Sequence, residues 1–351
     1  MAFAAVAAGG VIMAFGRVRS FLSGLALVVA AWAPAQAEPI DASTCRGHDV
    51  LPELYASVPG ARERVQAAAS RTPNGEALLW RISRAGIKPS YLFGTIHLSD
   101  ERVTVLPRSV VEAMDAAKLV ALEVADVSPK AFGVALAKLQ DRVVFTDGRS
   151  LASMLDTVEM ASVHSSLSAV GFPPAAQDRL RPWFVSMMLS VSKCERKRLQ
   201  TGLQPLDLQI GARARKRGLA VVSLETLEGQ LLAMASIPEG DQLSTLKATL
   251  KTKARTADAV ESMLQRYLAR EMAKVLPMQA EMMRAAGVDP SAMKSLQHAL
   301  LTVRNPRMRD AALPILVKGE AFIAVGALHL IGEDGLVALL REAGYEVTPV
   351  D

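Results

Sequence analysis

The pattern Gly-x-x-His-Leu occurs twice in the chain, each time after a short apolar run. It appears in "YLFGTIHLSD", where Gly94 precedes His97, and again in "FIAVGALHLIGEDG", where Gly326 precedes His329. Each apolar run has the length of a buried strand, so each histidine should follow the carboxyl end of a strand. Neutral imidazoles bind divalent transition metals and carry protons. One such pattern arises easily by chance, whereas two in the same context favour a metal or catalytic site.

Two glutamates end further apolar runs, Glu123 in "LVALEV" and Glu225 in "LAVVSLE". Ligands bind outside the carboxyl ends of parallel strands, so we expect both carboxylates beside the two histidines. Two imidazoles and one carboxylate would hold a divalent metal with an open position for water, and the metal would activate that water. The other glutamate would act as a general base or fix an imidazole tautomer. Either glutamate could take either role.

Four neighbouring residues are predicted to support these groups. Gly94 and Gly326 are expected to take positive φ angles that turn the chain sharply off each strand end. In "TVRNPRMRDAALPIL", Asn305 is predicted to be a helix N-cap, with a proline at the first helical position. Arg304 is not needed for that cap. We expect it to hold a substrate carboxylate or a developing oxyanion.

The hydrophobic pattern predicts the elements that position these residues. "LLWRIS" and "SYLFGT" are expected to form a hairpin across "RAGIKP", followed by the helix "PRSVVEAMDAAK" and the strand "LVALEV". The carboxyl end repeats this plan with the strand "AFIAVG", the helix "LVALLREAG" and the strand "YEVTPV". Each strand-helix-strand unit favours parallel pairing. The sequence therefore predicts an α/β fold, with a mixed, largely parallel sheet built from duplicated strand-loop-helix-strand units.

Long helical insertions are expected to cap this sheet. Apolar residues recur at helical spacing over about 128–205 and 228–312, within a single domain of residues 38–351. Many of these residues are Met, Leu and Ala. Met-rich helix faces usually form core, and a peptide-binding groove is the alternative interpretation.

The amino end has the layout of a secretory signal peptide over residues 1–37. Arg17 and Arg19 precede the apolar "FLSGLALVVAAWAP", and "AQA" suits cleavage after Ala37. Met13 is an alternative start to the chain, and an uncleaved anchor is the alternative to cleavage. No later segment is apolar enough for the ~20 residues of a membrane span. We therefore expect the mature chain to be exported, to the periplasm or the cell exterior.

Charge, cysteines and missing motifs narrow the function classes. The formal charge of +5 falls to +3 when a leader carrying two arginines is removed, and the basic clusters lack interleaved aromatic residues. Nucleic acid is therefore not an expected partner. The two cysteines, Cys45 and Cys194, predict a disulfide in an exported protein. His-Glu-x-x-His, Gly-x-Ser-x-Gly and glycine-rich nucleotide motifs are absent, which argues against a helix-borne zinc peptidase, a serine hydrolase and a nucleotide-binding protein.

Taken together, "YLFGTIHLSD", "LVALEV", "LAVVSLETLEGQ", the "RN" before a helix and above all "FIAVGALHLIGEDGLVALLREAGYEV" resemble the TraB/PrgY/GumN family. That family is similar to the Tiki metalloproteases, which cleave Wnt proteins. The resemblance covers essentially the whole mature chain and implies a metal-dependent hydrolase of the peptidase kind. Its paired motifs would map to Gly94–His97 and Gly326–His329, and its acidic positions to Glu123 and Glu225. The implied metal is manganese or cobalt, and a mixed imidazole and carboxylate site is also compatible with zinc.

The prediction from sequence is an exported metal-dependent hydrolase whose substrate is a peptide or small protein. His97, His329 and Glu123 are the expected metal ligands, and Glu123, Glu225 and Arg304 the expected catalytic residues. The alternative is a non-catalytic protein of the same fold that binds or sequesters a peptide or signal molecule, as some members of this broad group act in pheromone shutdown. A third hypothesis is structural, with the histidines hydrogen-bonded to the glutamates. The sequence leaves the substrate and the oligomeric state open.

Overall fold

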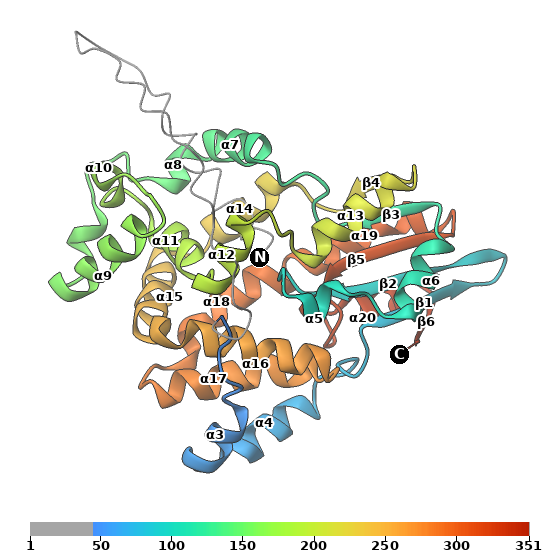
Figure 1. The fold of residues 1–351 in the computed structure, drawn as a ribbon, viewed down its shortest axis with the longest axis horizontal. Coiled ribbons are helices and arrows are strands. Elements are labelled where there is room, and N and C mark those ends of the chain that lie inside the picture. Colours follow the sequence, from blue (N-terminus) through green and yellow to red (C-terminus); the bar gives the residue numbers. More distant parts are fainter. Residues whose placement is uncertain (1–44, 351) are drawn as a thin grey trace, which may run out of the picture.

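The computed structural model describes residues 45–350, and the predicted leader lies outside the described residues. These residues form a six-stranded mixed sheet accompanied by many helices (Figure 1). The strand order is β4-β3-β5-β2-β1-β6. The strands are β1 (Leu79–Arg84), β2 (Ile87–Thr95), β3 (Leu119–Leu122), β4 (Ala220–Ser223), β5 (Ala321–Gly326) and β6 (Glu346–Pro349). The predicted α/β fold class is confirmed.

Four neighbouring strands of the sheet run parallel to one another. β5 pairs in parallel with β2 on one side and with β3 on the other, and β3 pairs in parallel with β4. β1 is antiparallel to both β2 and β6. The predicted hairpin is β1–β2, with a shorter turn than expected because β2 already begins at Ile87. The carboxyl ends of β2, β5, β3 and β4 therefore meet at one edge of the sheet.

The two strand-helix-strand units do not form parallel neighbours, which corrects our expectation from the sequence. The first unit leads from β2 through α5 (Glu101–Thr104) and α6 (Arg108–Asp115) to β3, but β5 lies between β2 and β3. The second leads from β5 through η7 (Ala327–His329) and α20 (Leu336–Glu342) to β6, which pairs with β1. β5 is buried along almost its whole length, and a strand that is apolar on both faces belongs at the centre of a sheet.

Helices cover both faces of the sheet. On β5, Phe322 and Ala324 face one side and share a core with apolar residues of α6, α13 and α16. Ile323 and Val325 face the other side and share a core with residues of α19 and α20. Alternate residues of a strand point to opposite faces, so β5 contributes to both cores. The three helices not yet bounded are α13 (Leu206–Lys216), α16 (Thr256–Leu268) and α19 (Arg304–Leu316).

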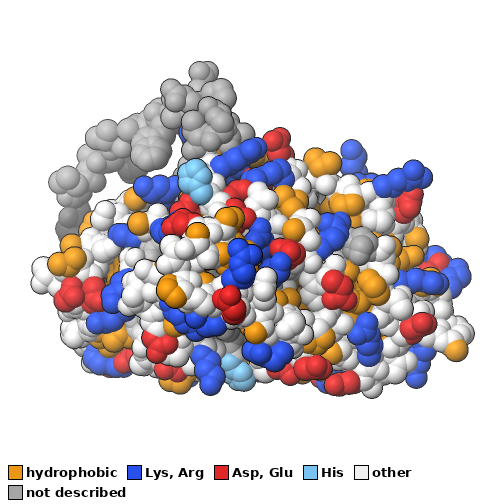
Figure 2. All heavy atoms as spheres, turned by 90° about the horizontal axis from the view of Figure 1, so that it is seen from below, with side chains coloured by type: hydrophobic (Ala, Val, Ile, Leu, Met, Phe, Trp, Pro, Cys, Tyr) orange, Lys and Arg blue, Asp and Glu red, His pale blue; other side chains and the backbone are white. Residues whose placement is uncertain are grey.

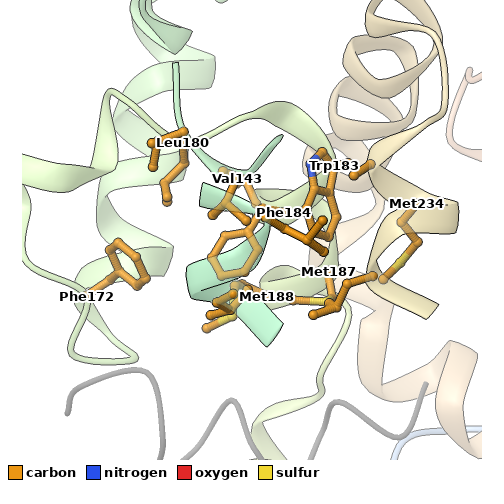
Figure 3. Packing of buried hydrophobic residues seen from close by; sticks show 14 of the residues in the cluster. Val143, Phe172, Leu180, Trp183, Phe184, Met187, Met188 and Met234 are labelled. Carbon is orange, nitrogen blue, oxygen red and sulfur yellow. The ribbon is translucent and has the colours of Figure 1, made fainter. Parts of the chain in front are cut away.

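Several of the helices inserted between β3 and β4 and between β4 and β5 lie beside the sheet (Figure 1), and they form a further apolar core. Trp183, Phe184 and Met187 of α11 lie together in it, near Met234 of α14 (Figure 3). The first insertion holds α7 (Pro129–Lys138), α8 (Gln140–Val143), α9 (Thr157–Ser168), α10 (Pro174–Gln177), α11 (Pro182–Leu189), α12 (Lys193–Gln200) and then α13. The second holds α14 (Leu227–Ala235), α15 (Glu239–Thr252), α16, α17 (Val275–Ala285), α18 (Lys294–Gln297), η6 (His298–Thr302) and α19.

A disulfide ties the amino-terminal part of the described chain to the first insertion. It joins Cys45 to Cys194 on α12, and the predicted bridge is confirmed. Two helices follow Cys45 before the sheet begins, α3 (Leu51–Ser57) and α4 (Ala61–Ala69), and both contact α17.

The surface carries side chains of both charges, as the similar numbers of basic and acidic residues in the sequence lead one to expect. On the face drawn in Figure 2, lysine and arginine side chains are interspersed with aspartate and glutamate side chains. Among the helices of residues 45–350, none combines the length and the apolar character needed to cross a bilayer.

Candidate functional site

The carboxyl edge of the parallel strands carries the four residues that the sequence singles out. Glu123 directly follows β3, and His97 and Glu225 each come two residues after β2 and β4. His329 ends η7, the single turn that follows β5. Since these strands are neighbours and run parallel, their ends bring all four side chains to one place. The positions that the strand pattern predicts are thus the positions that the structure shows.

Glu123 lies at the centre of this group. Its Oε1 accepts a hydrogen bond from the backbone N–H of Gly326 at 2.6 Å. The same oxygen lies 3.6 Å from Nε2 of His329 and 3.9 Å from Nε2 of His97. Both separations exceed hydrogen-bond length, so the imidazoles face the carboxylate without bonding to it. The structural hypothesis, in which the histidines are hydrogen-bonded to the glutamates, does not describe this geometry.

Each imidazole is held instead through its other nitrogen. Nδ1 of His97 is 2.9 Å from Oδ1 of Asp207 on α13, and Nδ1 of His329 is 2.6 Å from Oδ1 of Asn305 on α19. The Asn305 amide is oriented by its Nδ2, which donates to the carbonyl oxygen of Asp334 at 2.7 Å. An oxygen acceptor beside Nδ1 favours the tautomer that carries its proton on Nδ1. The lone pair of the neutral ring then lies on Nε2. Both lone pairs therefore face Glu123.

Arg304 joins the two glutamates. Its Nη2 donates to Oε2 of Glu123 at 2.8 Å and to Oε2 of Glu225 at 2.7 Å, while its Nε donates to Glu225 at 2.9 Å. Gln230 on α14 reaches the same two oxygens, at 3.1 and 3.4 Å. Arg304 is only 2% exposed. Its guanidinium thus compensates the two buried carboxylates, and in this structure it positions them and is not free to bind a substrate carboxylate.

Burial and charge set the protonation states at the site. Burial lowers the pKa of His329 to about 3, and the nearby Glu123 carboxylate only partly opposes this shift. The imidazole is therefore neutral near pH 7. Burial also disfavours ionised Glu123, but its interactions with His329, Arg304 and His97 hold the pKa of this carboxyl well below its usual range. With His329 neutral, Arg304 remains as a cation that stabilises the Glu123 carboxylate at neutral pH.

The two motif glycines are needed because neighbouring atoms leave little room for a side chain. Positive φ is not the reason, which corrects the prediction from the sequence. Neither is among the residues with positive φ, and Gly326 has φ −55° and ψ 135°. A Cβ on Gly326 would lie 3.1 Å from Oε1 of Glu123, and a Cβ on Gly94 would lie 3.0 Å from the backbone of Ala327. The backbone must approach this closely for the Gly326 N–H to bind Glu123, and a glycine allows it.

Asn305 does not cap a helix, contrary to the prediction. Helix α19 begins at Arg304, with Val303 at the N-cap position, and it continues the π-helical turn η6. No free helix start remains for Asn305 to cap. Its side chain instead joins His329 to the carbonyl of Asp334, which makes it a positioning residue for the imidazole.

Asp207 and Gln230 belong to the site, but the sequence did not reveal them. Asp207 resembles any acidic residue in the first turn of a helix, where it is favoured on electrostatic grounds alone. Gln230 follows Glu225 by five residues, which carries a signal only once α14 is known to start beside the end of β4. Asp207 contacts His97 and Gln230 contacts Glu123 across more than 100 positions of sequence, so no local pattern marks these two contacts.

A cavity of about 260 Å³ opens beside these residues. His97, Arg304, Gly326 and His329 lie along one side of it, and most of the remaining lining is apolar and comes from the inserted helices. The cavity is slightly smaller than typical small-molecule pockets of ~300–1,000 Å³. The site thus adjoins a largely apolar cavity.

The donor set suits a cation, although the side chains do not enclose one. Within residues 45–350, no group of three or more His, Cys, Asp or Glu side chains forms a metal-holding cluster as it stands. Two imidazole lone pairs nevertheless face one carboxylate oxygen. Two glutamate side chains also share the single guanidinium of Arg304. Such nitrogen and oxygen donors fit a divalent transition metal.

The comparisons with known proteins agree on one family. The model of the TraB/PrgY/gumN family matches residues 78–349. The uncharacterized protein YbaP of Shigella flexneri is 24% identical over 264 residues, which cover 74% of this chain and 90% of YbaP, and YbaP of Escherichia coli strain K12 gives the same figures. No solved structure matches the chain. The similarity to Tiki metalloproteases stays a prediction from the motifs.

Proposed function

The chain belongs to the TraB/PrgY/gumN family, and on that premise we propose that it is an exported metal-dependent hydrolase acting on peptides. One observation carries the proposal. Nε2 of His97 and Nε2 of His329 both face Oε1 of Glu123, beyond hydrogen-bond distance, while each Nδ1 is held by another side chain. Imidazoles oriented through Nδ1 with free Nε2 lone pairs are typical of metal ligands.

His97, His329 and Glu123 would hold the metal. Manganese, cobalt and zinc are the candidates, since each accepts mixed imidazole and carboxylate donors. The bound ion would supply Lewis acidity and a water molecule of lowered pKa.

The chain's own residues would then prepare the site for hydrolysis. Arg304 and Gln230 hold Oε2 of Glu225, which leaves Oε1 of that carboxylate to accept a proton from water as a general base. Arg304 keeps Glu123 ionised, and Asp207 and Asn305 keep the Nε2 lone pairs available. Glu123, Arg304 and His329 are buried, and low exposure to water strengthens their interactions.

Export is supported by the disulfide, which is typical of oxidising compartments, and by the leader pattern in the sequence. Amino-terminal sequencing of the protein recovered from a periplasmic fraction would test it. We expect the mature chain to begin after Ala37. An intact leader on membrane-associated protein would instead favour the uncleaved anchor.

Elemental analysis tests the metal site most directly. We expect purified protein to carry about one manganese, cobalt or zinc ion per chain, and the His97→Ala/His329→Ala variant to lose it. The His164→Ala variant is the matched control, because His164 is an exposed histidine that pairs with Asp178 and should not affect metal content. Full metal content in the double variant would show that the site is wrong.

The cavity favours a second candidate function, a non-catalytic protein that binds or sequesters a peptide or signal molecule. A binding protein needs the apolar cavity but no metal. A peptide library incubated with the protein and each of the three metals separates the two candidates. Cleavage with one metal supports the hydrolase, whereas saturable binding without cleavage under every condition supports the binding protein.

A further inference from the structure

The apolar cavity lies between the strand ends and the inserted helices. Thr95 and His97 line it where β2 ends, while Met187 of α11, Met234 of α14 and Met263 of α16 contribute apolar surface. Met187 and Met234 also approach each other in the packed core of the insertions (Figure 3). Methionine side chains are flexible and polarisable, so they adapt to an irregular or mobile apolar ligand.

Three buried oxygens in the cavity wall have no hydrogen bond among the described residues, although their side chains are almost completely buried. They are Oγ1 of Thr95, Oε1 of Gln242 and Oε2 of Glu195. The Glu195 oxygen still lies 3.7 Å from Nη1 of Arg198, so it has a charged neighbour. Gln242 is held through its Nε2, which donates to the carbonyls of Ala235 and Ile237, so its Oε1 is left as an acceptor. Buried polar atoms are normally satisfied, and unsatisfied oxygens beside a cavity indicate a ligand with polar groups of its own.

We propose that this cavity binds an aliphatic chain attached to an amide, which lies next to the bond that is cleaved. The inference rests on the proposed hydrolase function and names its substrate specificity. The apolar walls take the aliphatic chain, and the amide groups satisfy Thr95 and Gln242. Among the described residues that line the cavity, Arg304 is the only Lys or Arg, and it is already bonded to Glu123 and Glu225, so it is not available to an acidic ligand.

Two kinds of molecule carry this chemistry, a peptide with an aliphatic residue and a fatty acyl amide. Their shared feature is a hydrocarbon chain beside an amide. In both cases affinity should increase with the number of methylene groups buried, by about fourfold for each one.

The experiment measures binding by isothermal titration calorimetry to the full mature protein after treatment with EDTA. Removing metal prevents turnover, so binding is read independently of hydrolysis. One set of probes is acetyl-Gly-X-Gly-Gly-amide, in which X is alanine, 2-aminobutyrate, norvaline or norleucine. The other is glycinamide acylated with acetyl, butanoyl, hexanoyl or octanoyl groups. We expect the dissociation constant to fall about fourfold per methylene in at least one set. The probe set whose dissociation constant depends on chain length shows whether the hydrocarbon chain of the ligand belongs to a peptide residue or to a fatty acyl group.

A variant that fills the cavity locates the binding. Thr249 of α15 lines the cavity, whereas Lys251, two residues later, is exposed. Thr249→Trp should abolish the dependence on chain length, and the matched control Lys251→Trp should keep it. Met263→Gln, on a different helix, should weaken the dependence on chain length. It replaces Thr249→Trp as the test if Thr249→Trp does not keep the wild-type circular dichroism spectrum.

Equal affinity for all chain lengths in both sets, measured on the wild type, would overturn the proposal. A chain-length dependence that persists in folded Thr249→Trp or folded Met263→Gln would overturn the assignment to this cavity. Failure of the hydrolase proposal looks different, because it appears as absent metal or absent cleavage while binding to the metal-free protein is unaffected.

Discussion

At the residue scale, the site depends on charges that compensate one another out of contact with water. Glu123 and Glu225 are both bonded to Arg304, and all three side chains are at most 8% exposed. A buried carboxylate that loses its only cationic partner remains desolvated and uncompensated. Arg304 is therefore the residue whose removal should disturb the fold and the site together.

Arg304→Gln should lower the free energy of unfolding by ~3–5 kcal/mol, the usual effect of breaking a buried ion pair. Arg309→Gln on the same helix is the matched control. Arg309 pairs with the largely exposed Asp310, so its loss should change stability by less than ~1 kcal/mol. Urea denaturation followed by circular dichroism measures both. Equal effects of the two substitutions would contradict the role assigned to Arg304.

Gly326 makes a different contribution, since only the absence of a side chain lets its N–H reach Glu123. Gly326→Ala should destabilise the protein by ~1–3 kcal/mol, because the added Cβ would crowd Oε1 of Glu123. Gly240→Ala is the control, as a Cβ there meets nothing within 4 Å inside helix α15. That change should be neutral or stabilising by up to ~1 kcal/mol. Thermal melting compares the two, and a neutral Gly326→Ala would contradict the close approach.

At the scale of elements, strand periodicity and the rule for parallel sheets were enough to predict where the chemistry gathers. His97, Glu123, Glu225 and His329 each follow an apolar run, and parallel neighbours end at a common edge. The strand order was not predictable in the same way. The connection from β2 to β3 passes one intervening strand, β5, and the connection from β5 to β6 passes two, β2 and β1. This order depends on which strand is buried on both faces, a property of the assembled sheet.

The roles of helix residues were also hard to predict, because they too depend on how the elements assemble. Asn305 before a proline has the local pattern of an N-cap, but a π-helical turn leads directly into α19 and removes the helix start. Asp207 holds His97 across 110 positions of sequence. Contacts of this kind depend on how elements pack, so a single sequence contains no local signal for them.

The loop that carries His97 is fastened to two helices by an ionic network. Arg102 bonds Asp100 and Glu261 of α16, and Arg198 of α12 also bonds Asp100. The hydrogen bond from Arg102 is the largest cause that lowers the pKa of Glu261, and arginine contacts outweigh burial in lowering the pKa of Asp100. This network should make stability depend on pH in the acid range.

Both carboxyls have a lower pKa in the folded protein than the ~3.9 and ~4.3 of unfolded chains. The unfolded state therefore binds more protons in acid. The stabilisation is complete above about pH 5 and is lost as the pH falls through the folded pKa values.

Arg102→Gln should reduce stability at pH 7 and also reduce the further loss of stability between pH 5 and pH 3. Arg108→Gln, which removes an exposed pair with Glu112, should leave the wild-type profile unchanged. Midpoints of urea denaturation between pH 3 and pH 7 measure how stability depends on pH. Parallel curves for wild type and Arg102→Gln would exclude the ionic network as the source of this dependence.

At the scale of the whole molecule, one covalent bond connects the amino-terminal segment to the inserted helices and, through them, to the site. Cys194 lies on α12 beside Glu195, whose carboxylate accepts the backbone N–H of Ser99 at 2.9 Å. Ser99 is two residues from His97. The bridge therefore fixes a helix that in turn holds the loop of a proposed metal ligand.

The disulfide closes a loop with a sequence separation of 149 residues, and a loop of this length restricts the unfolded chain strongly. Cys45→Ala/Cys194→Ala should lower the free energy of unfolding by ~2–5 kcal/mol relative to the oxidised wild type. The reduced wild type is the control, because it loses the same bond without any substitution and should match the double variant. Urea denaturation with and without reductant measures all three forms. Since the bridge acts mainly on the unfolded chain, the folded double variant should keep the wild-type circular dichroism spectrum. A double variant as stable as the oxidised wild type would mean that packing of α3, α4 and α12 alone holds this end of the molecule.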